Sequence, residues 1–390
     1  MATNPLSATQ GLFQLYYLIN DGFAGFAATI AVLFATLAVP PNGAIRNYRL
    51  SLHFMAASYM VLSLGTITEA LFREAAMTSG MMLNVYLRMI SSSYVIVLFK
   101  TAMICIVNAG YLKVRKVALE CVPTTILSVA ILAIASGFLP ESLESPTFWI
   151  FRLYYAFQLL RSGILFQGYT RQIKERIDNY YAGQKDSYLA WIRQITYLWI
   201  SIALFAFCCF LLPSSTLMLA LSIYAALAFV ASGIRYLNFA FAFHQLAPVF
   251  ALEPAEPQAA STLVGIDVDG LLGRLSRLME RDRLYADEGL TIARLGERLG
   301  VSRNQLSELV NCKIGMNFRN YINSLRIEDA KRMLEADPSA GILDIALSCG
   351  FNSKSTFNAA FSRHAGTNPS EWRRSNCLRP NMTTSGSGYD

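Results

Sequence analysis

Two groups of polar side chains in this chain have the types and spacing to do chemistry. The first lies on two short segments near the C-terminus, 303–311 and 353–363, each of which follows a tight turn. Arginine can hydrogen-bond to guanine, asparagine to adenine and glutamate to cytosine on the edges of DNA bases. The side chains that we expect to face outward are Arg303, Asn304, Ser307, Glu308, Asn352, Lys354, Ser355, Asn358 and Arg363, with Arg373 and Arg374 against the DNA backbone. Glu308 is the weakest of these candidates, because an acid near phosphates is repelled unless it meets cytosine.

The second group consists of ionisable residues inside long apolar segments. Such residues are costly in hydrocarbon and mark functional sites by default. Two acids and two bases are expected at one outer level, where they could pair and line a polar pocket: Asp21, Glu69, Arg88 and Arg152. Lys100 and Arg161 are expected deeper, without an obvious acid partner, facing water or an anionic ligand. The alternative is that the outer charged side chains extend to the membrane–water interface and that the others form ion pairs with a structural role only.

Several classes of site have no support in the sequence. No HExxH, GxSxG or nucleotide-binding loop occurs, and the three histidines are scattered at His53, His244 and His364. The seven cysteines form no CxxC pair, which favours reduced core residues over disulfides or metal ligands. We therefore expect no catalytic residue, metal or cofactor, and a chain that is not an enzyme.

The N-terminal part has the composition of a membrane bundle. The chain has 390 residues, of which 54% are hydrophobic and only 15% charged, whereas a soluble domain is about a quarter charged. A helix needs about 20 apolar residues to cross a bilayer. Seven segments qualify within residues 1–250: 15–39, 50–72, 85–109, 119–139, 147–169, 188–212 and 216–244. No Lys or Arg precedes the first, so we expect it to remain in the mature protein.

The loops between these segments predict an orientation. With the N-terminus outside, the cytoplasmic loops hold nine basic residues and the outer loops hold only Arg73. Basic residues concentrate on the cytoplasmic side of membrane proteins. Seven crossings would then leave the C-terminal part in the cytoplasm of a bacterium, below its inner membrane. The net charge of +7 suits both a lipid surface and nucleic acid, so it does not choose between them.

The region after residue 250 changes character. Residues 251–265 contain two prolines and are predicted to be a linker. Residues 266–285 have the spacing of an amphipathic helix, which would either dimerise as a short coiled coil or pack onto its own domain. Within 286–376 we predict two units of helix, glycine-containing turn and helix, joined by a longer helix over 318–336. Residues 377–390 are predicted to be a disordered tail.

The stretch Thr291–Arg374 resembles the AraC/XylS-type transcriptional regulators. The segment Asp344–Arg374, DIALSCGFNSKSTFNAAFSRHAGTNPSEWRR, carries the pattern of their second unit, with Trp372 where Tyr or Phe is more usual. The resemblance covers about 85 residues. It implies two recognition helices in successive major-groove faces, about 34 Å apart. A connecting helix of about 19 residues spans roughly 28 Å, which suits that separation.

The expected protein is all-α, with a seven-helix transmembrane bundle and a cytoplasmic double helix-turn-helix domain. We expect a one-component regulator in which a signal, a small molecule or a lipid in the bundle controls binding to double-stranded promoter DNA. A homodimer, and RNA polymerase in the case of an activator, are further expected partners, besides the lipid bilayer. Two alternatives stay open: a regulator whose bundle is a passive tether, and a transporter with a regulatory DNA-binding tail.

Overall fold

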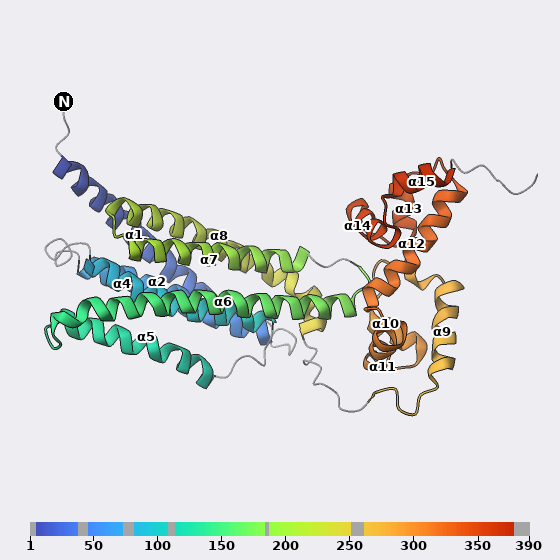
Figure 1. Ribbon diagram of the computed structural model, residues 1–390, viewed down its shortest axis with the longest axis horizontal. Helices are drawn as coiled ribbons and strands as arrows, with labels where there is room; N and C mark the ends of the chain where they lie inside the picture. The colour runs from blue at the N-terminus through green and yellow to red at the C-terminus, as the bar shows by residue number, and fades with distance from the viewer. Residues whose placement is uncertain are drawn as a thin grey trace, which may run out of the picture. The chain divides into compact units, whose positions relative to one another are not determined.

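The computed structural model describes residues 5–37, 46–72, 82–107, 114–183, 187–250 and 261–377. All the regular structure in these residues is helical (Figure 1), so the all-α prediction is confirmed for them. The chain divides into two compact units. One comprises Met1–Ile173 and Tyr188–Glu253, and the other comprises Lys174–Ser187 and Pro254–Asp390. The predicted tail beyond Cys377 and most of the predicted linker, 251–260, lie outside the described residues.

The first unit is a bundle of long helices. Each predicted apolar segment forms most of one helix: α1 (Pro5–Thr36), α2 (Arg46–Leu71), α4 (Met82–Val107), α5 (Val114–Ala135), α6 (Glu144–Tyr180), α7 (Ser187–Leu211) and α8 (Ser215–Phe250). A short 3-10 turn, Glu141–Leu143, precedes α6. Helix α2 packs against both α1 and α4, and α8 packs against α1 (Figure 1).

Six helices of the described residues, and not the predicted seven, are long and apolar enough to cross a membrane. They contain Gly11–Thr36, Tyr48–Leu71, Leu83–Ile106, Arg115–Ala135, Ala190–Leu211 and Ser215–Asn238. The predicted fifth segment, 147–169, does form a helix within α6. This helix is not among the six. Arg152, Gln158 and Arg161 interrupt its apolar run and lower its mean hydropathy.

The bundle buries polar side chains within its apolar core and exposes large apolar side chains on its outside. Polar residues such as Asn20, Ser93 and Thr101 are buried, while large apolar residues such as Ile126 and Leu227 are exposed. In water, an extensive exposed apolar surface is unfavourable and marks a surface that meets another apolar phase. This distribution and the six apolar helices are compatible with a membrane protein.

The second unit is built from shorter helices whose starts follow local capping. They are α9 (Val268–Glu280), α10 (Ile292–Leu299), α11 (Arg303–Glu308), α12 (Phe318–Ala336), α13 (Ile342–Ser348), α14 (Lys354–Ala365) and α15 (Pro369–Cys377). A π-helical turn, Leu309–Ile314, continues α11. The predicted caps Thr291, Ser302 and Ser353 each accept a hydrogen bond from a backbone N–H of the following turn. A side-chain oxygen at this position satisfies one of the donors that a helix start leaves unpaired.

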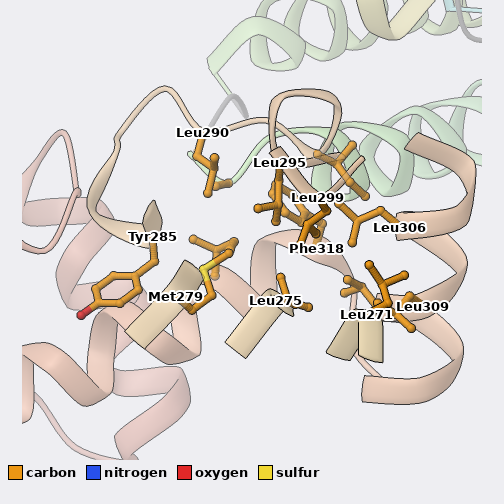
Figure 2. Close-up of a cluster of buried hydrophobic side chains, with 14 residues drawn as sticks. Leu271, Leu275, Met279, Tyr285, Leu290, Leu295, Leu299, Leu306, Leu309 and Phe318 are labelled. Atoms are coloured by element: carbon orange, nitrogen blue, oxygen red, sulfur yellow. The ribbon is translucent and has the colours of Figure 1, made fainter. Parts of the chain in front are cut away.

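Two apolar cores occupy this unit, and α12 contributes to both. Phe318 and Ile322 of α12 belong to the first core, which is formed together with residues of α9, α10 and α11. Figure 2 shows this core with Phe318 labelled. Ile327, Ala330 and Leu334 join the second core, with residues of α13 and α14. One helix therefore fixes the spacing of the two helix-turn-helix units.

Helix α9 packs onto its own domain. Its apolar positions Leu271, Leu275 and Met279 are at most 1% exposed and belong to the first core (Figure 2). The coiled-coil alternative required this same face to meet a second chain. That face is already buried within the domain, so the structure favours packing over dimerisation.

Candidate nucleic-acid interface

Helix α11, which is the predicted first recognition helix, begins with a capping box. The Ser302 hydroxyl accepts from Gln305 N at 3.3 Å, and Gln305 Oε1 accepts from Ser302 N at 2.9 Å. These reciprocal bonds fix the first turn of the helix after the tight turn. Leu306 points inward and is fully buried, so the side chains on the opposite side of α11 are available outside.

The predicted readers on α11 fall into two sets. Asn304 is exposed, and its Oδ1 accepts from Nη2 of the half-buried Arg303 at 2.8 Å. Ser307 is half-buried and accepts from Asn311 Nδ2 at 3.2 Å. Glu308 instead accepts from Thr262 N at 2.7 Å, and from the hydroxyls of Ser261 and Thr262.

Glu308 is therefore held by the segment before α9. The hydrogen bonds from Ser261 and Thr262 lower the pKa of its carboxyl, because they stabilise the charged form. This contact gives the residue a structural partner that the sequence pattern did not indicate. Contact with cytosine would have to share the carboxylate with these donors, so the role of Glu308 as a reader stays a prediction.

The residues predicted to contact DNA bases in the second helix-turn-helix unit lie on α14 or just before it. Asn352, Lys354, Ser355 and Arg363 are exposed, and Asn358 is half-buried. Asparagine and lysine at the start of a recognition helix can contact base edges and phosphates, respectively. The exposed side chains of this set therefore provide a polar surface without any change in the fold.

Arg373, predicted to contact the DNA backbone, is half-buried. Its Nη2 donates to the carbonyl oxygen of Ala340 at 2.7 Å. This bond ties α15 to the loop before α13. The exposed neighbour Arg374 has no such contact among the described residues, and it is the better candidate for a phosphate.

Sequence reasoning missed a buried arginine that joins the two helix-turn-helix units. Arg326 of α12 is 1% exposed, and it donates from Nε to the Tyr285 carbonyl at 2.6 Å and from Nη2 to the Asp287 carbonyl at 2.8 Å. Its guanidinium lies 5.5 Å from the centre of the Phe351 ring. Burial lowers the pKa of Arg326 to about 10, because the charged form loses water. The only signal in the sequence was its place between two apolar positions of the helix.

The turn of the second unit also approaches this region closely. Gly350 has a φ of +88°, and a Cβ on it would lie 2.5 Å from the carbonyl oxygen of Ala286. Only glycine adopts such a backbone conformation without cost. The turn between α13 and α14 is thus packed directly on the segment before α10.

Comparison with known proteins identifies this domain. A family model described as a helix-turn-helix domain matches residues 295–375. The probable transcription factor PqrA of Proteus vulgaris is 33% identical over 97 residues, which are 25% of this chain and 78% of that protein. The chain belongs to the AraC-type transcriptional regulators. Its helix-turn-helix domain is of a kind that binds double-stranded DNA.

Two further regulators match part of this chain. The melibiose operon regulatory protein of Escherichia coli is 31% identical over 88 residues, which are 23% of this chain and 29% of that protein. The activator RhaR of Klebsiella pneumoniae is 30% identical over 122 residues, or 31% of this chain and 39% of that protein. The chain thus spans less than half of either protein.

The DNA-binding unit of this AraC-type regulator includes a piece of chain from before α7. Within this unit, Ala182 is buried in the first core, and its N–H donates to the Leu290 carbonyl at 3.1 Å. Asp178 forms an ion pair with Arg319 of α12 at 2.5 Å, in which both side chains are largely buried. Residues 174–183 are therefore packed as part of the folded domain.

A cavity of about 80 Å³ lies beside the second recognition helix. It is bordered by the ion pair of Asp178 and Arg319, and by Asn352, Thr356 and Arg363 around α14. Two of the predicted DNA-reading residues, Asn352 and Arg363, thus face the same cavity as the segment 174–187. A movement of that segment would change the surroundings of the second recognition helix.

In the bundle, the structure brings together two of the four charges predicted at one level. Arg88 Nη2 and Glu69 Oε2 form an ion pair at 2.8 Å, and the Tyr16 hydroxyl donates to the same carboxylate at 2.6 Å. Arg88 also donates to Ser222 Oγ at 3.0 Å and to Asn20 Oδ1 at 3.1 Å. This network is mostly buried, so its polar groups satisfy one another.

The other two charges of that level lie apart from the network. Asp21 is exposed on α1. Arg152 donates to the Phe210 carbonyl, and its guanidinium lies over the rings of Phe148 and Trp149 at 4.0 and 4.7 Å. The prediction of a single polar pocket formed by all four residues does not describe their arrangement.

The expectation that Lys100 and Arg161 lack an acid partner is wrong. Both pair with Glu120 of α5, Arg161 at 2.7 Å. Lys100 and Glu120 each lie within about two helical turns of the loop between α4 and α5. Because consecutive helices run in opposite directions, these two residues share a depth that their separation in sequence conceals. Among the described residues, no group of three or more potential ligands could hold a metal ion.

Proposed function

We propose that this chain is a membrane-embedded one-component regulator of a bacterium. In it, a signal or ligand in the bundle controls sequence-specific binding of promoter DNA by the C-terminal domain. The observation that carries this proposal is the division of α6. Its residues up to Ile173 belong to the bundle, and those from Lys174 belong to the DNA-binding unit. A passive tether needs no such shared helix, whereas a sensor needs a structural element that both units stabilise.

The DNA-binding step is proposed to use α11 and α14 as recognition helices. The proposed readers are the exposed or half-buried residues Arg303, Asn304, Ser307, Asn352, Lys354, Ser355, Asn358 and Arg363. Glu308 and Arg373 are instead proposed to hold the domain together through their contacts with Thr262 and Ala340. The length of α12 suits the distance between successive major-groove faces.

Replacing Asn304 with alanine should relax sequence preference. An asparagine that contacts adenine contributes about 1–3 kcal/mol of discrimination against other bases. We expect the variant to lose about that much affinity for its preferred DNA and little for unrelated DNA. Binding of the full chain to fragments selected from a random pool would measure both quantities.

Arg374→Gln is the matched control for this prediction. A lost phosphate contact should weaken binding to all sequences alike and reduce the slope of the salt dependence by about one. If Asn304→Ala behaves like Arg374→Gln, with equal loss on every sequence, then Asn304 does not read a base.

The bundle is proposed to cross the bilayer with α6 included. Along α6, a stripe of apolar side chains is 52–68% exposed: Trp149, Ile150, Leu153, Phe157, Leu160 and Ile164. The opposite face holds the buried Phe151 and Tyr155, and Arg161 pairs with Glu120. An apolar stripe outside and paired charges inside would permit a crossing despite the low hydropathy. Seven crossings, with the basic loops inside, support an N-terminus outside and a cytoplasmic DNA-binding domain in the inner membrane.

Removing the charges of the buried pair should change promoter output. In the doubly neutral variant Glu69→Gln with Arg88→Gln, the bundle keeps hydrogen-bonding groups at this site but loses the ion pair. Coupling free energies between sites are typically 1–3 kcal/mol, so we expect a change of about fivefold or more. A reporter behind a target promoter would measure it, normalised to the amount of protein in the membrane fraction.

Asp21→Asn is the control, because Asp21 is exposed outside this network. It should leave output unchanged. Unaltered output in the doubly neutral variant, at an equal membrane level, would favour the passive tether. Uptake of a tracer into vesicles that contain the chain would instead favour the transporter alternative.

A further inference from the structure

A cavity of about 110 Å³ lies within the bundle unit. It is lined by residues of α1, α2, α4, α6, α7 and α8. On the same measure, one water molecule needs about 10–15 Å³. The cavity is therefore large enough for several heavy atoms, either a small molecule or one end of a longer chain, and residues of six helices line it.

The wall of the cavity is mainly apolar and aromatic. Phe23, Phe99, Trp199, Leu221 and Phe229 all line it. The Trp199 ring stacks on Phe99 with centres 3.5 Å apart, and its Nε1 donates to Ser232 Oγ at 3.0 Å, so its orientation is fixed. A wall that is mainly apolar and aromatic favours apolar ligands.

The charged residues of the lining are already neutralised. All three guanidinium nitrogens of Arg88 donate hydrogen bonds, two of them to Glu69. Lys100 pairs with Glu120, which lies outside the lining. A charged ligand would find no unpaired opposite charge here, and burying an unpaired charge is unfavourable.

One polar group of the lining is unused. Thr196 of α7 is 6% exposed, and its buried hydroxyl has no hydrogen-bond partner among the described residues. A threonine in a helix ordinarily donates to the carbonyl one turn earlier, as Thr101 does to Val97 at 2.8 Å. A buried hydroxyl without a partner is unfavourable unless something else fills that role.

We propose that this cavity binds a neutral, predominantly apolar molecule that exchanges one hydrogen bond with Thr196. A long-chain alcohol and an uncharged membrane lipid share this chemistry. The binding follows from the lining residues alone. Only its role as the signal rests on the proposed function.

The test uses the full chain in lipid nanodiscs with Trp199 as its only tryptophan. Trp149, Trp191 and Trp372 are replaced with phenylalanine. A terminally brominated long-chain alcohol quenches tryptophan fluorescence on contact, so it is the probe. We expect saturable quenching of Trp199, with binding about three- to tenfold weaker in Thr196→Val, as for the loss of one hydrogen bond. Thr29→Val is the matched control, because Thr29 is exposed and outside the lining.

Three results would overturn the proposal. One is equally strong binding of the brominated carboxylate or alkylammonium of the same length. Another is non-saturable quenching that a variant with only the exposed Trp149 shows equally, since that reports partition into the bilayer. The third is saturable binding that survives Ala203→Leu, which fills the cavity from α7.

Solvent extraction distinguishes the two possible sources of the ligand. Solvent extraction of the purified chain yields a bound lipid if the membrane supplies it, and only added alcohol if it does not. Saturable binding without any effect on promoter output would leave the site standing and remove the sensing function. If the doubly neutral variant of Glu69 and Arg88 changes promoter output but the alcohol does not bind, the sensing function stands and the proposed ligand site is removed.

Discussion

Gly350→Ala is expected to abolish specific DNA binding while leaving the bundle folded. The alanine would adopt a φ of +88° with its Cβ 2.5 Å from the Ala286 carbonyl oxygen. The backbone conformation alone costs about 1–3 kcal/mol, and the clash is with backbone, which cannot move aside as a side chain can. We expect a total loss of more than about 3 kcal/mol in the stability of the second helix-turn-helix unit, a large part of a typical domain's total.

Gly366→Ala is the matched control for this prediction. Gly366 ends α14 with a φ of +73°, and a Cβ on it would meet no atom within 4 Å. This variant should lose only the conformational part, about 1–2 kcal/mol. Hydrogen exchange of the α13 and α14 amides, with binding to selected DNA, would measure both variants. Equal effects would mean that the close approach to Ala286 does not hold the turn.

The elements of the DNA-binding unit could be predicted because their signals are local. Thr291, Ser302 and Ser353 each precede an apolar pattern of helical period, and each caps a helix in the structure. The connecting helix over 318–336 also agrees with α12, because Asp337 and Pro338 end its pattern. Caps, turns and periodicity involve residues within one or two turns of each other, so a single sequence contains them.

The contacts that organise the sites could not be predicted in this way. Glu120 of one helix pairs with Lys100 and Arg161 of two other helices, and Glu308 accepts hydrogen bonds from Thr262. Arg326 is buried by carbonyl groups about 40 residues away in the chain. Each of these depends on which helices pack together, and residue type alone does not determine that.

Reversing the charge of Asp178 is expected to release the segment 174–187 from the DNA-binding domain. Asp178→Arg would place a second positive charge beside Arg319, in a site where both original side chains are less than 20% exposed. Removing one partner of a buried ion pair costs about 3–5 kcal/mol, and somewhat less where water still reaches it. Exchange of the Ala182 amide, which donates to Leu290, should accelerate by about 100-fold or more, at about 1.4 kcal/mol for each factor of ten.

The double exchange, Asp178→Arg with Arg319→Asp, decides what this contact does. It restores opposite charges, so we expect much of the amide protection to return. If α6 transmits the signal, promoter output should change in the single variant and recover in the double variant, because both follow the same equilibrium of the segment. A passive tether predicts the same exchange data with constant promoter output. If promoter output changes and recovers together with the amide protection of Ala182, α6 couples the bundle to the DNA-binding domain. If promoter output stays constant while protection changes, such coupling is contradicted, whichever molecule the bundle binds.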